Sequence, residues 1–383
     1  MLRKLTAFFM IFVLVLSVCI PCMANTDNSE YFNGDDAKSF ILIESVSETV
    51  LSEQRSDEKF KVAGLSSLAP LLLVCEAFDS KLIDKDATIK VSQEAASFGG
   101  VSAFLENGEN IKADLLLKSA VIICASDAIY ALAESLYQNE KAFLDKLNSR
   151  LQELSIDAKY ESIIDSSIAL SAKDLSKIAK ALIKSEAYRS YSTVFYDSIT
   201  HEDGRQTELA NPNKLVKQLA GCVGVGTGSS NEAGYCGAFA VTRSDTTYIA
   251  VIIGAQNSSK RFKLASEMME YVFASYKTAN IAKSGDVMAE NVDVTGGTLK
   301  KVNLTAKDDC VLIFENGTNY EAFFEVPETL EAPLEKDAVV GKIEYRTNDG
   351  KVIGTLLLSV QTGVEKASFW DEVFKIFRSW LHA

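Results

Sequence analysis

The chain has 383 residues, 47% of them hydrophobic, and a formal net charge of -13. This length allows two domains, or one large domain with an appendage, and the apolar content can fill a sizeable core. The acidic balance argues against nucleic acid as a partner, because phosphate binding depends on clustered Lys and Arg. Only two histidines occur, His201 and His382, so the sequence indicates no metal site, no cofactor and no histidine-based catalysis.

The first 24 residues have the features of a secretory signal peptide. Two cations near the start precede an apolar run from Leu5 to Cys19, and a small-residue sequence ends at Ala24. The run is about 15 residues long, shorter than the ~20 residues that a spanning helix needs. We therefore expect an exported protein. An uncleaved N-terminal anchor and lipoprotein cleavage before Cys19 are the alternatives.

Five cysteines follow the leader and form no recognisable framework. Their number is odd and their spacing irregular, which fits neither a disulfide scaffold nor a zinc site. We expect most of them to be buried as small apolar side chains: Cys75, Cys124, Cys222, Cys236 and Cys310.

Residues 25–277 are predicted to form one α/β (α+β) domain. The apolar patch Phe40–Ile43 suggests an edge strand. Pro70 is expected to kink the helix in which it lies, because proline removes a backbone donor. Helical patterns cover 65–77, 111–138, 141–154, 173–186 and 260–276, and strand-like alternation covers 238–242 and 247–254.

The chain changes in character after residue 277. Short β-type segments, separated by turn signals such as Asn316-Gly317, predict a small all-β domain at 278–365. Residues 366–383 are predicted to form an amphipathic helix whose apolar side chains fall within an arc of roughly 160°. Such a helix suits a membrane interface, and docking onto a protein surface is the alternative. The apolar face consists of Phe369, Trp370, Val373, Phe374, Ile376, Phe377, Trp380 and Leu381.

Several phrases of the 25–277 region resemble the D-alanyl-D-alanine carboxypeptidase family of penicillin-binding proteins. They are EAASFGGVSAFLENGE (94–109), ADLLL (113–117), SDAIYALAE (126–134), NPNKL (211–215) and NEAGYC (231–236). The resemblance covers essentially the whole mature chain, including the β-rich appendage and the terminal helix. It implies a penicillin-binding/β-lactamase-like serine peptidase fold and a peptidoglycan stem peptide as ligand. It also implies a location at the outer face of the bacterial cytoplasmic membrane.

The family's chemistry needs three elements around one cleft. A Ser-x-x-Lys turn supplies the nucleophile and its base, because a serine is a weak nucleophile without an adjacent base. A Ser-x-Asn loop supplies a second hydroxyl and an amide that holds the substrate. A Lys-Thr-Gly strand supplies a cation for the substrate's terminal carboxylate. The resemblance places these elements at 64–67, 124–126 and 226–228.

Each element departs from the family pattern in this sequence. Gly64 replaces the nucleophilic serine, Ser67 its lysine, Cys124 and Ser126 the serine and asparagine, and Gly226 the strand lysine, while Thr227 and Gly228 are kept. No lysine lies between residues 64 and 80, so shifting the alignment restores nothing. We therefore expect a pseudoenzyme that binds wall peptides or a wall-synthesis protein.

Four alternatives remain open from the sequence. The chain could be an active D,D-carboxypeptidase that uses Ser66 or Ser67. The stretch Ser56-Asp-Glu-Lys59 satisfies Ser-x-x-Lys, but it lies in a polar stretch before the helix. Cys124 could act as a nucleophile only if a cation or a helix start favoured its thiolate. Nucleotide binding by GVGTG (224–228) lacks the established phosphate-loop patterns.

Overall fold

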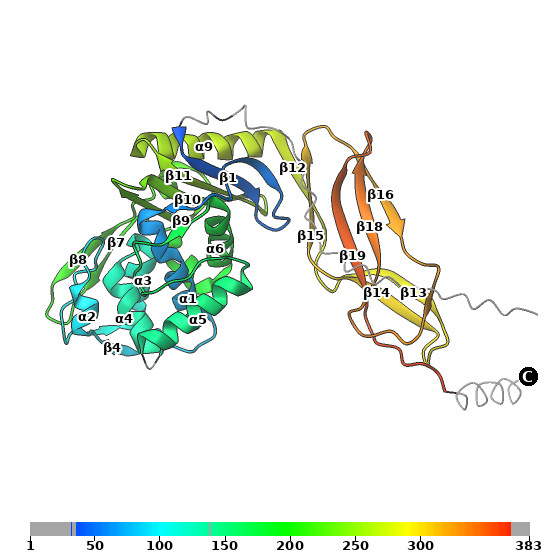
Figure 1. Ribbon diagram of the computed structural model, residues 1–383, viewed down its shortest axis with the longest axis horizontal. Helices are drawn as coiled ribbons and strands as arrows, with labels where there is room; N and C mark the ends of the chain where they lie inside the picture. The colour runs from blue at the N-terminus through cyan, green and yellow to red at the C-terminus, as the bar shows by residue number, and fades with distance from the viewer. Residues whose placement is uncertain (1–31, 33–35, 138, 369–383) are drawn as a thin grey trace, which may run out of the picture.

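The computed structural model describes residue 32, residues 36–137 and residues 139–368. These residues form an α/β lobe and an elongated β-rich domain, which follow each other where α9 (Ser258–Ser275) runs into β12 (Tyr276–Ala282) (Figure 1). The predicted signal peptide and the predicted terminal helix lie outside the described residues. Within the described ranges, no helix is both long enough and apolar enough to cross a bilayer.

The α/β lobe contains a 3-10 turn at Ala63–Ser67 and nine α-helices in the described residues. The helices are α1 (Leu68–Asp79), α2 (Gln93–Ser97), α3 (Ala113–Ile123), α4 (Ser126–Leu136), α5 (Glu140–Glu153), α6 (Ala172–Lys184), α7 (Glu186–Ser192), α8 (Leu215–Gln218) and α9. The strands are β1 (Ser39–Glu44), β2 (Val50–Gln54), β3 (Phe60–Lys61), β4 (Thr88–Lys90), β5 (Asn110–Lys112), β6 (Ala169–Leu170), β7 (Tyr196–Thr200), β8 (Gln206–Ala210), β9 (Cys222–Ser230), β10 (Gly234–Arg243) and β11 (Thr246–Ala255).

A five-stranded antiparallel sheet of order β2-β1-β11-β10-β9 divides the lobe into two apolar layers. Successive side chains of a strand point to opposite faces. Phe40 and Leu42 therefore pack with α9, whereas Ile41 and Ile43 pack with the layer that contains α1, α3, α4 and α6. The prediction that 40–43 forms an edge strand is wrong, because β1 lies inside the sheet and β2 forms the edge.

Two helix predictions also need correction. The periodic stretch 111–138 is interrupted at Cys124, which adopts a left-handed conformation (φ 55°, ψ 44°) and ends α3 two residues before α4 begins. Pro70 does not kink a helix. The α-helix begins only at Leu68, so Pro70 lies in its first turn, where the backbone N–H groups have no intrahelical acceptor.

The C-terminal domain contains strands only. They are β12, β13 (Val287–Thr295), β14 (Lys301–Ala306), β15 (Cys310–Glu315), β16 (Tyr320–Glu325), β17 (Thr329–Glu331), β18 (Val339–Thr347) and β19 (Val352–Val360). Six form a sheet of order β16-β18-β19-β14-β13-β17, and β12 pairs with β15. Leu304, Leu312, Ile343 and Leu358 are buried in its core. The predicted fold class, an α/β domain followed by an all-β domain, is confirmed.

Candidate active site

The three motif-bearing elements meet beside β9. Gly64 lies in the 3-10 turn before α1, Cys124 lies between α3 and α4, and Gly226 lies in β9. A Cβ atom built on Gly226 would lie 3.8 Å from Sγ of Cys124 and 3.7 Å from Cδ2 of Leu65. A Cβ atom built on Gly64 would lie 3.6 Å from Cα of Gly228. The positions that the resemblance assigns to one cleft are therefore neighbours in the fold.

Gly64 and Gly228 contact each other through their backbones. A Cβ atom on Gly228 would lie 2.5 Å from the Gly64 nitrogen and 2.9 Å from its Cα, so a side chain at 228 would force the backbone to move. In the reverse direction a Cβ atom on Gly64 meets only ordinary contacts, at 3.6 and 3.7 Å. Packing thus requires glycine at 228 but not at 64.

Apolar side chains surround position 226. Its Cβ atom would lie 3.2 Å from Cδ2 of Leu68, and both Leu65 and Leu68 are fully buried. A Cβ atom in this position would require the end of Leu68 to shift by a few tenths of an ångström, and the atoms nearest to it are the apolar side chains of Leu68 and Leu65 and the thiol of Cys124. The space beside Gly226 has the character of a hydrophobic core.

Tyr160 is hydrogen-bonded to the 3-10 turn. The buried Tyr160 hydroxyl donates a 2.6 Å hydrogen bond to the carbonyl of Ser66, and Asn148 exchanges two hydrogen bonds with the Tyr160 backbone. Burial raises the pKa of Tyr160, so the phenol stays a neutral donor. The side chains of Ser66 and Ser67 are also buried, and in the described chain no Lys or Arg is bonded to either hydroxyl.

Cys124 is half-buried at the C-terminal end of α3. Burial raises the pKa of its thiol to about 11, and the negative end of the helix dipole also disfavours an anion there. At pH 7 the thiolate fraction is therefore about one in ten thousand. This environment lacks the cation that would activate a cysteine nucleophile.

We expect Cys124 to react slowly with iodoacetamide. Compared with a free cysteine of pKa about 8.5, its smaller thiolate fraction predicts alkylation roughly 300-fold slower at pH 7. The rate should rise about tenfold per pH unit between pH 7 and 9, because the thiolate fraction grows until pH approaches the pKa. Mass spectrometry of the Cys124 peptide measures the rate, and C124S controls for assignment. Fast labelling at pH 7 would contradict the assigned environment.

Asp127 shapes the border of the site on the side of residues 102–105. Its buried carboxylate accepts hydrogen bonds from the Ser102 hydroxyl at 2.6 Å and from the amides of Ala103 and Leu105 at 2.9 and 3.2 Å. The amide of Ser126 in turn donates to the Val101 carbonyl at 2.9 Å. The loop before residue 106 is thereby fixed to the start of α4.

Two residues near β9 were not identified from the sequence. The buried Arg261 donates from one nitrogen to the carbonyls of Gly228 and Cys236, at 3.0 and 2.8 Å, and its Nε has no partner among the described residues. Tyr188 donates to the carbonyl of Val225 at 2.9 Å. Arg261 falls in register with the buried residues of α9, and a cation within an apolar stripe could have identified it.

The literal Ser-x-x-Lys at 56–59 does not form a nucleophile–base pair. The Ser56 hydroxyl donates to the Glu53 carboxylate, and the Lys59 ammonium binds the backbone carbonyl and the carboxylate of Asp157. All five described cysteines are free thiols, and four of them are buried. Within the described residues no His, Cys, Asp or Glu cluster could hold a metal ion.

Comparison with known proteins decides the family. The family model for D-alanyl-D-alanine carboxypeptidase matches residues 26–257. The chain belongs to the D-alanyl-D-alanine carboxypeptidase family. The model for the C-terminal domain of penicillin-binding protein 5 matches residues 276–366, in the β-rich part of the chain. The resemblance inferred from the sequence is therefore confirmed.

Members of this carboxypeptidase family resemble the chain over nearly its whole length. The D-alanyl-D-alanine carboxypeptidase DacF of Bacillus subtilis is 26% identical and covers 99% of each chain. DacC of Escherichia coli is 27% identical, covering 90% of this chain and 89% of its own. The structure of penicillin-binding protein 5 from Haemophilus influenzae superimposes with a TM-score of 0.77 at 22% identity, covering 86% of this chain and 98% of that one. The family as a whole is one of peptidoglycan metabolism.

Proposed function

We propose that this family member does not hydrolyse peptidoglycan peptides and instead binds a wall peptide or a wall-synthesis protein. The observation that carries the proposal is the junction of Gly64, Cys124 and Gly226. Gly64 and Gly226 stand where the resemblance expects a serine and a lysine, so these positions supply neither a serine–lysine pair nor a strand lysine. In a comparable serine peptidase, loss of the nucleophile or base costs about a million-fold in rate.

The surroundings of the junction support this proposal. Leu65 and Leu68 lie against position 226, and burial raises the pKa of the neighbouring Cys124 thiol to about 11, so this thiol is protonated at neutral pH. What remains for a peptide is the edge of β9, which has β10 on one side only. Thr227 and Gly228 lie on this strand, and we assign them to backbone pairing with an extended ligand.

The test is release of D-alanine from a pentapeptide that ends in D-Ala-D-Ala. We expect release no faster than with a mock preparation, and no covalent adduct with labelled penicillin at high label concentration. The S66A/S67A double variant is the matched control and should behave identically. Release above the mock level that disappears in this variant would contradict the proposal.

A working carboxypeptidase with an unusual nucleophile is the second candidate. It is favoured by similarity to named carboxypeptidases over 99% of the chain and by the hydroxyls of Ser66 and Ser67 beside Gly64. It predicts a penicillin adduct that is lost in S66A or S67A. The burial of both side chains and the absence of a bonded cation in the described chain disfavour it.

We also propose a location in the bacterial envelope, at the outer face of the cytoplasmic membrane. The proposal rests on the leader-like residues 1–24 and on the apolar face at Phe369–Leu381. Fractionation of cells that express the full chain, and of cells that express a chain ending at residue 366, tests it. Loss of membrane association in the shorter chain is the expected result, and its retention would contradict a peripheral anchor.

A further inference from the structure

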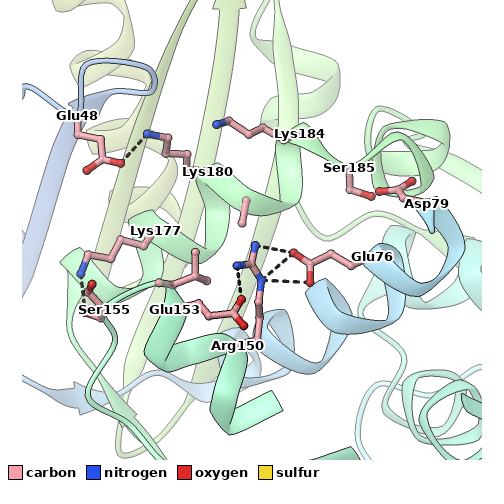
Figure 2. Close-up of a pocket in the computed structure, with 12 residues that line it drawn as sticks. Glu48, Glu76, Asp79, Arg150, Glu153, Ser155, Lys177, Lys180, Lys184 and Ser185 are labelled. Atoms are coloured by element: carbon pink, nitrogen blue, oxygen red, sulfur yellow. Dashed lines mark hydrogen bonds and ion pairs between the residues drawn. The ribbon is translucent and has the colours of Figure 1, made fainter. Parts of the chain in front are cut away.

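A polar pocket lies on the α/β lobe, away from the motif junction. Its cavity has a volume of about 580 Å³ and is bounded by the β1–β2 turn, α1, α5 and α6 (Figure 2). It opens beside Glu76 and Asp79 at the end of α1, a helix about 18 Å long, whereas Gly64 precedes the other end. We call this cavity the α6 pocket. Eight of its residues are ionisable: Glu48, Glu76, Asp79, Arg150, Glu153, Lys177, Lys180 and Lys184.

One wall of the α6 pocket is cationic. Lys177, Lys180 and Lys184 are spaced by three and four residues, so they lie on one face of α6. Lys180 forms an ion pair with Glu48 at 2.5 Å, whereas Lys177 donates to the carbonyl of Ser155 at 2.7 Å and has no carboxylate partner in the described part of the chain. Within the described residues, the ammonium of Lys184 has no hydrogen bond or ion pair. Two of the three lysines therefore face the pocket without a carboxylate partner.

The opposite wall is acidic. Arg150 is shared between Glu76, at 2.8 and 2.9 Å, and Glu153, at 2.9 Å, so two carboxylates neutralise a single guanidinium (Figure 2). Asp79 adds a third carboxylate, which accepts a hydrogen bond from the amide of Ala187 at 2.8 Å. Among the described residues Asp79 forms no ion pair. Glu76, Glu153 and Arg150 together carry a net charge of -1. Asp79 adds a second negative charge to this wall.

We propose that the α6 pocket binds a short zwitterionic peptide. Its carboxylate would pair with Lys184, while Lys177, about two turns away on the same face, adds positive charge to this wall. Its ammonium would pair with Asp79 and the Glu76 side of the acidic wall. A polyanion would meet the carboxylates, and a polycation would meet the lysines, so only a ligand with both charges suits both walls. The volume lies within the range of about 300–1,000 Å³ that is usual for small-ligand sites. The site shares no residue with the motif junction and does not depend on the function proposed there.

Isothermal titration of the purified chain with the tripeptide L-Lys-D-Ala-D-Ala tests the proposal. We expect binding that weakens about tenfold or more in K177Q/K184Q, because charge-assisted hydrogen bonds to the carboxylate are lost. The matched control is K173Q/K263Q. It removes the same charge from lysines that pair with Asp57 and Glu267 outside the pocket, and should bind as the parent chain does.

Two further probes separate this pocket from the β9 edge. The C-terminal amide of the tripeptide lacks its one negative charge, and the fully N-acetylated form lacks both of its positive charges. Both should bind at least several-fold more weakly. In NMR spectra the tripeptide should shift the amides of Ser155 and Ala181, including in a T227A variant. Absence of binding at millimolar peptide would overturn the proposal. So would equal weakening by both lysine pairs, or shifts confined to residues around Thr227.

Discussion

Replacement of Gly228 by alanine is expected to destabilise the α/β lobe by about 3 kcal/mol, at the upper end of the usual cost of overpacking. The added Cβ atom would lie 2.5 Å from the backbone nitrogen of Gly64 and 3.2 Å from that of Leu65. Neither contact can be relieved by a side-chain rotation, so the 3-10 turn and β9 must separate. The change corresponds to a fall in Tm of roughly 6–12 °C for a domain of this size.

The matched control for G228A is G64A, which adds the same methyl group on the other side of the same contact. Its Cβ atom meets only ordinary contacts at 3.6 and 3.7 Å, so we expect a change below about 0.5 kcal/mol. Differential scanning calorimetry of both variants measures the contrast. Equal losses of stability would contradict the prediction that a methyl group at 228, and not at 64, forces the two backbones apart.

Replacement of Asp127 by alanine is expected to cost about 3 kcal/mol or more. The carboxylate is buried and accepts hydrogen bonds from the Ser102 hydroxyl and the amides of Ala103, Leu105 and Ala128. Removing it leaves these donors unsatisfied, at about 1–3 kcal/mol for each one that stays buried. Urea unfolding measures the loss. Hydrogen exchange should also become faster at residues 102–105.

Two variants control for this prediction. D127N keeps one acceptor oxygen and should lose about half as much stability as D127A. D145A removes an exposed aspartate that pairs with Lys141 on the surface of α5, and such pairs contribute about 0–1 kcal/mol. If D127A and D145A unfolded at the same urea concentration, the prediction that the Asp127 hydrogen bonds stabilise the 102–105 loop would be refuted.

Much of the fold was predictable because long apolar patterns correspond directly to elements. The patterns at 141–154, 238–242 and 260–276 match α5, β10 and α9. The interior position of β1 was not predicted, although Phe40–Ile43 is a continuous apolar run, as strands with both faces covered commonly are. Its polar surroundings suggested an edge instead. The break at Cys124 carries no local signal, because the usual left-handed residues, Gly and Asn, are absent there.

The motif positions of the candidate site were predictable from the sequence, but the side chains that pack around them were not. The order of the family-like phrases indicated which positions belong to one cleft, and the structure brings Gly64, Cys124 and Gly226 together. The leucines beside Gly226 could not be foreseen, because their approach depends on how α1 packs against β9. The α6 pocket likewise brings α6 together with the end of α1, about a hundred residues earlier in the sequence, and no local pattern connects the two.

Gly64 and Gly226 differ in the space available for a side chain. This difference limits the order in which substitutions could build the family's serine-peptidase mechanism. A side chain can be added at Gly64 at once, but a serine there has no base to activate it. A lysine at 226 requires the side chain of Leu68 to shift, and a lysine at 67 must enter a buried position. Each of these substitutions alone is therefore neutral or harmful, and catalytic activity is gained only when all of them are present. If the chain is inactive, as we propose, the packing of α1 on β9 opposes a gain of the family's mechanism by single substitutions.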